Sequence, residues 1–160
     1  MKKIISFVCL IICLLSLCSC SNNTVFGKYD TEMTLTDIQS QFANYDTKYY
    51  GENAKTLQNT FIVKSYEWKG IVGELWFEFA GNTLSEIYFH SDYDDSRSLF
   101  DSNSEYIRMV HSLEKMVKRK YGKPDAEDGH EYYWYKAKYT LHMEVDDYSS
   151  ISNFRIIISF

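Results

Sequence analysis

Residues 72–79 read Val-Gly-Glu-Leu-Trp-Phe-Glu-Phe, and this stretch decides the fold. From Glu74 onward it alternates between large apolar residues and Glu or Trp, with the period of two that a half-buried β-strand requires. The alternation defines an apolar face with Leu75, Phe77 and Phe79 and a mixed face with Glu74, Trp76 and Glu78. The sequence therefore predicts a sheet with one covered face and one open face.

The neighbouring stretches extend this strand into an antiparallel meander. Residues 61–68 are rich in β-branched and aromatic residues, and residues 84–90 alternate again. Lys69-Gly70 and Gly81-Asn82 supply the turn residues between these strands. Three further strands are expected at about residues 132–136, 138–146 and 154–160.

Two helices are expected, one ahead of each group of strands. The first is predicted to begin at Thr36, because Thr36 and Gln39 have the spacing of a capping box. The second is predicted from about Ser102 to Tyr121, where apolar residues recur at helical spacing. The polar residues 44–59 are expected to form a loop, either alone or with a second short helix.

The two groups of strands resemble each other in sequence. A constant shift aligns Trp68 with Trp134, Leu75 with Leu141 and Glu78 with Glu144. Two unrelated amphipathic meanders would also look alike, but a repeat is favoured. The sequence predicts an α+β fold of two tandem helix-plus-three-stranded antiparallel meander units (αβββαβββ), with the helices packed on one sheet face. The units are expected at about residues 31–90 and 102–160, within a single domain of residues 31–160.

The first residues have the pattern of a bacterial secretion signal. Lys2 and Lys3 precede an apolar run over residues 4–17, which is shorter than the roughly 20 residues that span a bilayer. The run ends in Leu17-Cys18-Ser19-Cys20, which resembles the lipobox of bacterial lipoproteins. The resemblance implies that the signal is cut just before Cys20.

In that family the new terminal cysteine is acylated, so Cys20 is expected to tie the chain to a lipid bilayer. Residues 1–19 are then a signal peptide, and residues 20–30 are expected to be a lipidated tether. The expected location is the cell envelope, lipid-anchored and extracytoplasmic. In an organism with an outer membrane, Ser21 after the cysteine favours that membrane.

Composition excludes several classes of function. All four cysteines lie at or before Cys20, so the mature chain has no disulfide, thiol nucleophile or cysteine metal site. Removal of Lys2 and Lys3 from the 17 Lys and Arg leaves 15 against 22 Asp and Glu, a net charge of −7. Such an acidic body is not expected to bind nucleic acid through bulk electrostatics.

A helix opening with Met33-Thr34-Leu35-Thr36-Asp37-Ile38, then a loop and a meander, looks like the β-lactamase-inhibitor-protein fold. This order is also similar to small outer-membrane assembly lipoproteins of the SmpA/OmlA type. Both resemblances concern topology over about residues 31–160. They imply a binding protein rather than an enzyme, and the inhibitor fold implies a tandem repeat with a concave aromatic sheet face. They imply no particular binding residue.

The open sheet face is where a binding site is expected. By alternation, the candidate binding residues are Trp76, Tyr88, His90, His142, Glu144 and Arg155. Aromatic residues among charged ones are typical of protein recognition surfaces, and flat rings also stack on sugars. The simpler alternative is cross-strand pairing of Trp76 with Tyr88 and of Glu144 with Arg155, which would only stabilise the sheet.

No motif in the sequence indicates an enzyme. There is no nucleophile elbow, phosphate loop or dinucleotide fingerprint. Glu74 and Glu78 share a strand face but would be about 13 Å apart, beyond the spacing that glycosidases use. His90 and His142 with Glu144 would need a further ligand to hold zinc, so no metal or cofactor is expected. The favoured function is a non-catalytic binding or assembly module with an envelope protein as partner. The alternative is a glycan or small-ligand binding lipoprotein, and a hydrolase is less favoured.

Overall fold

The computed structural model describes residues 24–51, 58–92, 103–145 and 153–160. The predicted signal peptide and Cys20 therefore lie outside the described residues, as does Ser102, near which the second helix was expected to begin. Among the described residues, no helix has the length and apolarity needed to cross a membrane.

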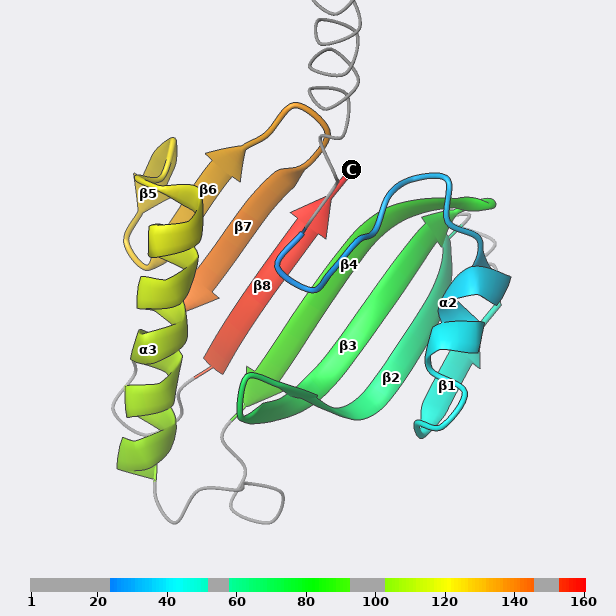
Figure 1. Cartoon of the computed structure of the whole chain (residues 1–160), viewed down its shortest axis with the longest axis horizontal. Coiled ribbons are helices and arrows are strands. Elements are labelled where there is room, and N and C mark those ends of the chain that lie inside the picture. Colours follow the sequence, from blue (N-terminus) through cyan, green and yellow to red (C-terminus); the bar gives the residue numbers. More distant parts are fainter. Residues whose placement is uncertain (1–23, 52–57, 93–102, 146–152) are drawn as a thin grey trace, which may run out of the picture.

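The strands of the described residues form one continuous antiparallel sheet (Figure 1). Their bounds are Thr47–Tyr50 (β1), Gln58–Trp68 (β2), Ile71–Ala80 (β3), Thr83–Asp92 (β4), Ala126–Asp128 (β5), Glu131–Tyr135 (β6), Thr140–Val145 (β7) and Asn153–Ser159 (β8). The order across the sheet is β1-β2-β3-β4-β8-β7-β6-β5. The last strand of the chain, β8, thus lies in the middle of the sheet and joins the two halves.

The predicted αβββαβββ fold of two tandem units is wrong. The described residues form a single eight-stranded sheet, in which β4 of the first half pairs directly with β8 of the second. Each helix is followed by four strands rather than three, because β1 and β5 occur in segments where no strand was expected. Both are short edge strands with exposed residues, so they lack the apolar alternation by which a strand is recognised in sequence.

Helix α2 spans Leu35–Gln41, and its first turn corrects the predicted cap. Thr34 is the N-cap: Asp37 N–H donates to Thr34 Oγ1 at 3.2 Å, and Thr34 N–H donates to Asp37 Oδ2 at 2.8 Å. The capping box is therefore Thr34 with Asp37, not Thr36 with Gln39. A carboxylate is the better partner, because it also complements the positive end of the helix dipole.

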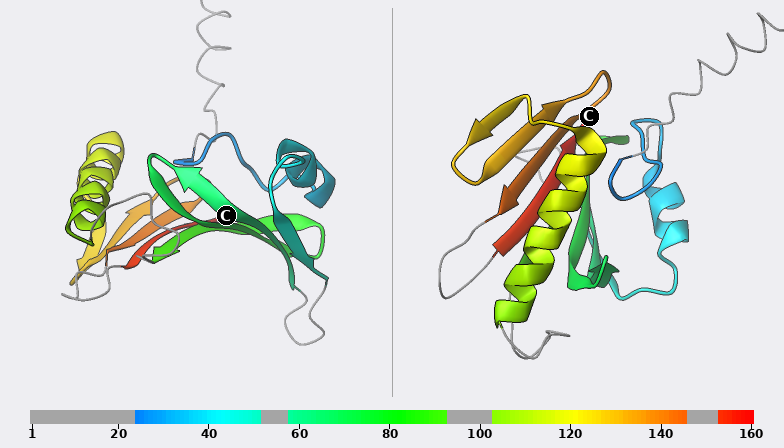
Figure 2. Two further views of the ribbon diagram at one scale, coloured as in Figure 1. Left: turned by 90° about the horizontal axis from the view of Figure 1, so that it is seen from below. Right: turned by 60° about the vertical axis from the view of Figure 1, so that its left-hand side comes forward.

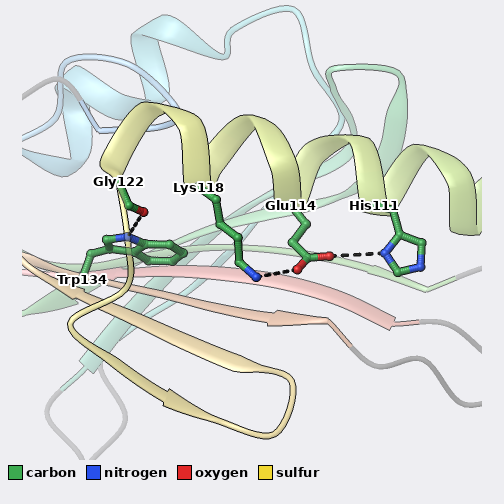
Figure 3. A network of polar contacts seen from close by, with 5 residues as sticks. All are labelled: His111, Glu114, Lys118, Gly122 and Trp134. Carbon is green, nitrogen blue, oxygen red and sulfur yellow. Dashed lines mark hydrogen bonds and ion pairs between the residues drawn. The ribbon is translucent and has the colours of Figure 1, made fainter.

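Helix α3 spans Asn103–Tyr121 and packs on the second half of the sheet through the apolar stripe that the sequence predicted. The buried residues of the stripe are Tyr106, Val110, Leu113 and Val117. At its C-terminal end, Trp134 Nε1 on β6 donates to the Gly122 carbonyl at 3.0 Å (Figure 3). Gly122 directly follows the helix, so this bond ties the end of α3 to the sheet.

One face of the sheet is covered by both helices and by residues 24–30. Figure 2 (left) shows the helices on the convex side of the bent sheet. Between them, Phe26 packs on Trp68 with ring centroids 5.3 Å apart, and Tyr29 packs on Phe77 at 5.4 Å. Residues 24–30 are thus part of the packed domain rather than part of the tether that was predicted over residues 20–30.

The opposite face of the sheet carries no helix and is here called the open face. In β3, Leu75, Phe77 and Phe79 are buried on the covered side, whereas Glu74, Trp76 and Glu78 are half-buried on the open side. The alternation read from residues 72–79 is confirmed. Any site on the open face is therefore presented away from the helices.

Candidate binding face

A row of apolar and aromatic side chains crosses the middle of the open face. The strand register pairs Trp76 with Tyr88, Tyr88 with Ile157, and Ile157 with His142. At its ends, Ile62 pairs with Trp76 and Tyr133 pairs with His142. Because paired residues share a face, these side chains form one row, here called the central row: Ile62, Trp76, Tyr88, Ile157, His142 and Tyr133.

The rings of the central row are stacked on each other. Trp76 stacks on Tyr88 with centroids 5.0 Å apart, and Tyr133 stacks on His142 at 4.3 Å with an angle of 6° between the planes. Trp76 Nε1 donates to Glu74 Oε2 at 3.0 Å, which restrains the orientation of the indole. Ile62 is only 3% exposed although it lies outside the main core. The row is therefore a second, smaller apolar cluster whose outer surface faces solvent.

Two carboxylates without a basic partner lie beside the central row. Glu78 and Glu86 are directly paired across β3 and β4, and Ser159 Oγ donates to Glu86 Oε2 at 3.1 Å. Within the described part of the chain, no Lys, Arg or His forms an ion pair with either of them. Partial burial, and then the charge of Glu86, raise the pKa of Glu78. Burial and the same two carboxylates raise the pKa of the Tyr88 hydroxyl.

The other side of the central row is charged but internally paired. Arg155 Nη1 donates to Glu144 Oε2 at 3.2 Å. Glu131 accepts a hydrogen bond from the Tyr133 hydroxyl, which raises the pKa of Tyr133 to about 12. Glu131 Oε2 also lies 3.4 Å from His142 Nε2, at ion-pair distance but without hydrogen-bond geometry. These contacts hold the rings of the second half in place.

The six residues predicted from sequence all lie on the open face, in two neighbouring rows. Trp76, Tyr88 and His142 belong to the central row. His90 pairs with Arg155, which pairs with Glu144. Strand β8 separates His90 from His142, and no group of three or more potential metal ligands occurs among the described residues.

The cross-strand contacts that the sequence suggested are present, since Trp76 stacks on Tyr88 and Glu144 contacts Arg155. They are compatible with a purely stabilising role and with a preformed binding face. Sequence reasoning missed Ile62, Ile157 and Tyr133. The available signal for Ile157 was its apolar side chain between Ile156 and Ile158, which places an apolar residue on both faces of one strand.

The fold and this face define a class of protein: one antiparallel sheet, covered on one side and bearing a packed aromatic band on the other. Comparison of the chain with known protein families, with curated proteins and with solved structures found no match. The function proposed below therefore rests on the residues and their geometry.

The unpaired carboxylates predict a pH-dependent stability. Because the pKa of Glu78 is raised on folding, the native state loses stability as pH rises through that pKa, and the loss is complete above it. Glu78→Gln should therefore raise the free energy of unfolding near neutral pH by up to about 1 kcal/mol, as expected for removal of a like-charge cross-strand pair.

The measurement is the urea midpoint of the wild type and the variant at neutral pH and at a pH low enough to protonate carboxylates, where the difference should vanish. Glu67→Gln, at an exposed position of β2, is the matched control and should change little. A destabilised Glu78→Gln protein at neutral pH would show that the carboxylate makes a favourable contact.

Proposed function

We propose that this protein is a lipid-anchored, extracytoplasmic lipoprotein that acts as a non-catalytic binding or assembly module. Its open face is proposed to bind a segment of another envelope protein. The observation that carries the proposal is the central row, a solvent-facing aromatic band held in place by stacking and by hydrogen bonds around its edges.

The dimensions of the central row suit a protein segment. The row crosses six neighbouring strands, β2 to β6 by way of β8, so it is about 24 Å wide at roughly 4.8 Å per strand. Aromatic residues in a preorganised band contribute binding energy at little cost in conformational entropy, and a charged rim sets the orientation of the partner. An extended strand or loop laid across the sheet would contact all of these rings.

The charges beside the row indicate the chemistry of the partner. Glu78 and Glu86 lie next to the Trp76–Tyr88 stack and have no basic partner among the described residues. A Lys or Arg of a bound segment would neutralise the pair and lie beside the face of an aromatic ring. The proposed partner segment therefore carries an apolar residue next to a basic one.

The anchor is the second half of the proposal and is supported by the lipobox resemblance at Leu17-Cys18-Ser19-Cys20. Acylation at Cys20 would hold the packed domain at the bilayer by a tether of only a few residues, since the domain already begins at Thr24. A module held this way meets partners in the same envelope compartment.

Trp76→Ala is expected to weaken partner capture by at least about 30-fold, the loss typical of an aromatic hot-spot residue, while the domain stays folded. The measurement is pull-down from envelope extracts, quantified by mass spectrometry. Tyr49→Ala is the matched control, because Tyr49 is 46% exposed but pairs with the buried Phe61 and so lies on the other face.

The same pair of variants separates the alternative function. If envelope sugars quench the Trp fluorescence of the wild type and of Tyr49→Ala but not of Trp76→Ala, the face binds glycans rather than protein. Equal capture by all three proteins would contradict a binding role for the central row.

A further inference from the structure

The point where the packed domain begins lies at the C-terminal end of α3. Lys120 Nζ donates to the Thr24 carbonyl at 3.2 Å, and Thr24 N–H donates to the Gly27 carbonyl at 2.8 Å. Thr24 is itself buried, with 2% exposure. Cys20 precedes Thr24 by four residues, which span at most about 14 Å. A bilayer that holds acylated Cys20 must therefore lie close to this end of the domain.

Two lysines from different elements line one cavity at this end of the domain. Lys69, in the turn between β2 and β3, and Lys120, at the end of α3, both line an open cavity that is also bordered by residues 24–27. Burial and the nearby charge of Lys69 lower the pKa of Lys120. Glu67 is a further charged residue at the cavity rim, and it forms no ion pair with either lysine.

The neighbouring Lys118, on the same helix, differs from Lys120 because it forms an ion pair with a carboxylate. Its Nζ lies 2.7 Å from Glu114 Oε1 and over the Tyr132 ring, and Glu114 also contacts His111 (Figure 3). Basic residues in the last turn of a helix are explained by the helix dipole alone. That explanation does not account for Lys69, which is on another element and lines the same cavity.

We propose that Lys69 and Lys120, here called the anchor-side patch, bind the phosphate groups of anionic lipids in the bilayer that holds Cys20. The inference rests on the proposed lipid anchor. The cavity that the two lysines line is bordered by residues 24–27, and residues 24–30 lie on the covered side of the sheet (Figures 1 and 2). This contact would therefore turn the helices toward the bilayer and the open face away from it.

Electrostatics favours this orientation. The mature domain is acidic overall, so an anionic surface repels most of its faces and attracts only a local basic patch. The attraction of basic residues to anionic lipids acts over about one Debye length, which the short connection to Cys20 allows. The open face, with Glu78 and Glu86, would then be available to a partner.

The test is lysine labelling of the full-length acylated protein in vesicles, with an amine-acetylating reagent and mass spectrometry. Vesicles of phosphatidylcholine alone are compared with vesicles that also contain phosphatidylglycerol. Lys69 and Lys120 are expected to label at least about three-fold more slowly in the anionic vesicles, and high salt should restore the rate. Lys48, which lies on the open face, is the internal control and should label equally in both.

Each outcome decides one point. Flotation with phosphatidylcholine vesicles tests the anchor without any charge effect, and failure to float would overturn both the anchor and this inference. Flotation with equal labelling of Lys69 and Lys120 in both vesicles would overturn this inference alone. Protection of the two lysines by inorganic phosphate, in phosphatidylcholine vesicles at matched ionic strength, would show a free-phosphate site instead of a membrane contact. Protection by the anionic vesicles only would support the proposal.

Discussion

Phe77→Ala is expected to lower the free energy of unfolding by about 3–5 kcal/mol, the cost of truncating a fully buried aromatic residue. Phe77 is 0% exposed, and its ring lies 5.4 Å from Tyr29, 5.5 Å from Phe42 and 6.3 Å from Phe61. On β3, Phe77 therefore contacts three separate parts of the chain: residues 24–30, the residue that ends helix α2, and the neighbouring strand β2. Since domains of this size are stable by about 5–15 kcal/mol, the loss is a large part of the total.

The control for Phe77→Ala is the adjacent residue on the other face. Trp76→Ala removes a larger side chain, but Trp76 is half-buried, stacks on Tyr88 and is the cross-strand partner of Ile62, so a cost of only about 1–2 kcal/mol is expected. Urea titration followed by circular dichroism measures both. Equal costs for the two variants would show that Trp76 is a core residue, and the binding proposal would lose its main support.

Cys20→Ala is expected to abolish acylation completely, whereas Cys18→Ala should leave it intact. In the lipobox resemblance the cysteine after Ser19 carries the lipid, and position 18 tolerates many residues. Several acyl chains at about 0.8 kcal/mol per buried CH₂ make a stable anchor, so the effect of removing them is all or none.

Intact mass spectrometry of membrane extracts measures both variants. The wild type and Cys18→Ala proteins should lack residues 1–19 and carry acyl groups, and Cys20→Ala should carry none. An unacylated wild-type protein, or loss of acylation in Cys18→Ala, would overturn the predicted anchor.

The strongly amphipathic elements could be predicted from the sequence because burial imposes a clear period on them. Residues 74–79 and 86–90 alternate as the structure requires, and the stripe of α3 faces the sheet. Between Leu84 and Glu86 an irregularity in the pairing with β3 interrupts the alternation. Gly73 is the exception within the deciding stretch: a Cβ there would lie 2.3 Å from the His90 carbonyl oxygen, so the strand needs glycine for close approach to β4. A single glycine in an alternating strand signals such an approach without revealing its partner.

The fold class could not be predicted because it depends on pairing between distant strands. Strand β8 is 60 or more residues from β4 in sequence, and nothing in either strand specifies the other. Edge strands β1 and β5 have no buried face, so no period marks them. The same limit applies to the site: alternation placed Trp76 and His142 on one face, but only the register shows that Ile157 lies between Tyr88 and His142.

Photo-crosslinking in living cells tests the central claim, that the open face binds a partner, most directly. A photoreactive residue is placed at Tyr88 in the central row, and in a second strain at Tyr49, which lies on the other face of the sheet. The predicted result is one envelope-protein adduct from position 88 alone, lost in Trp76→Ala, with the crosslinked segment carrying a Lys or Arg beside an apolar residue. Adducts from position 49 only, or the same adducts from both positions, would contradict the claim.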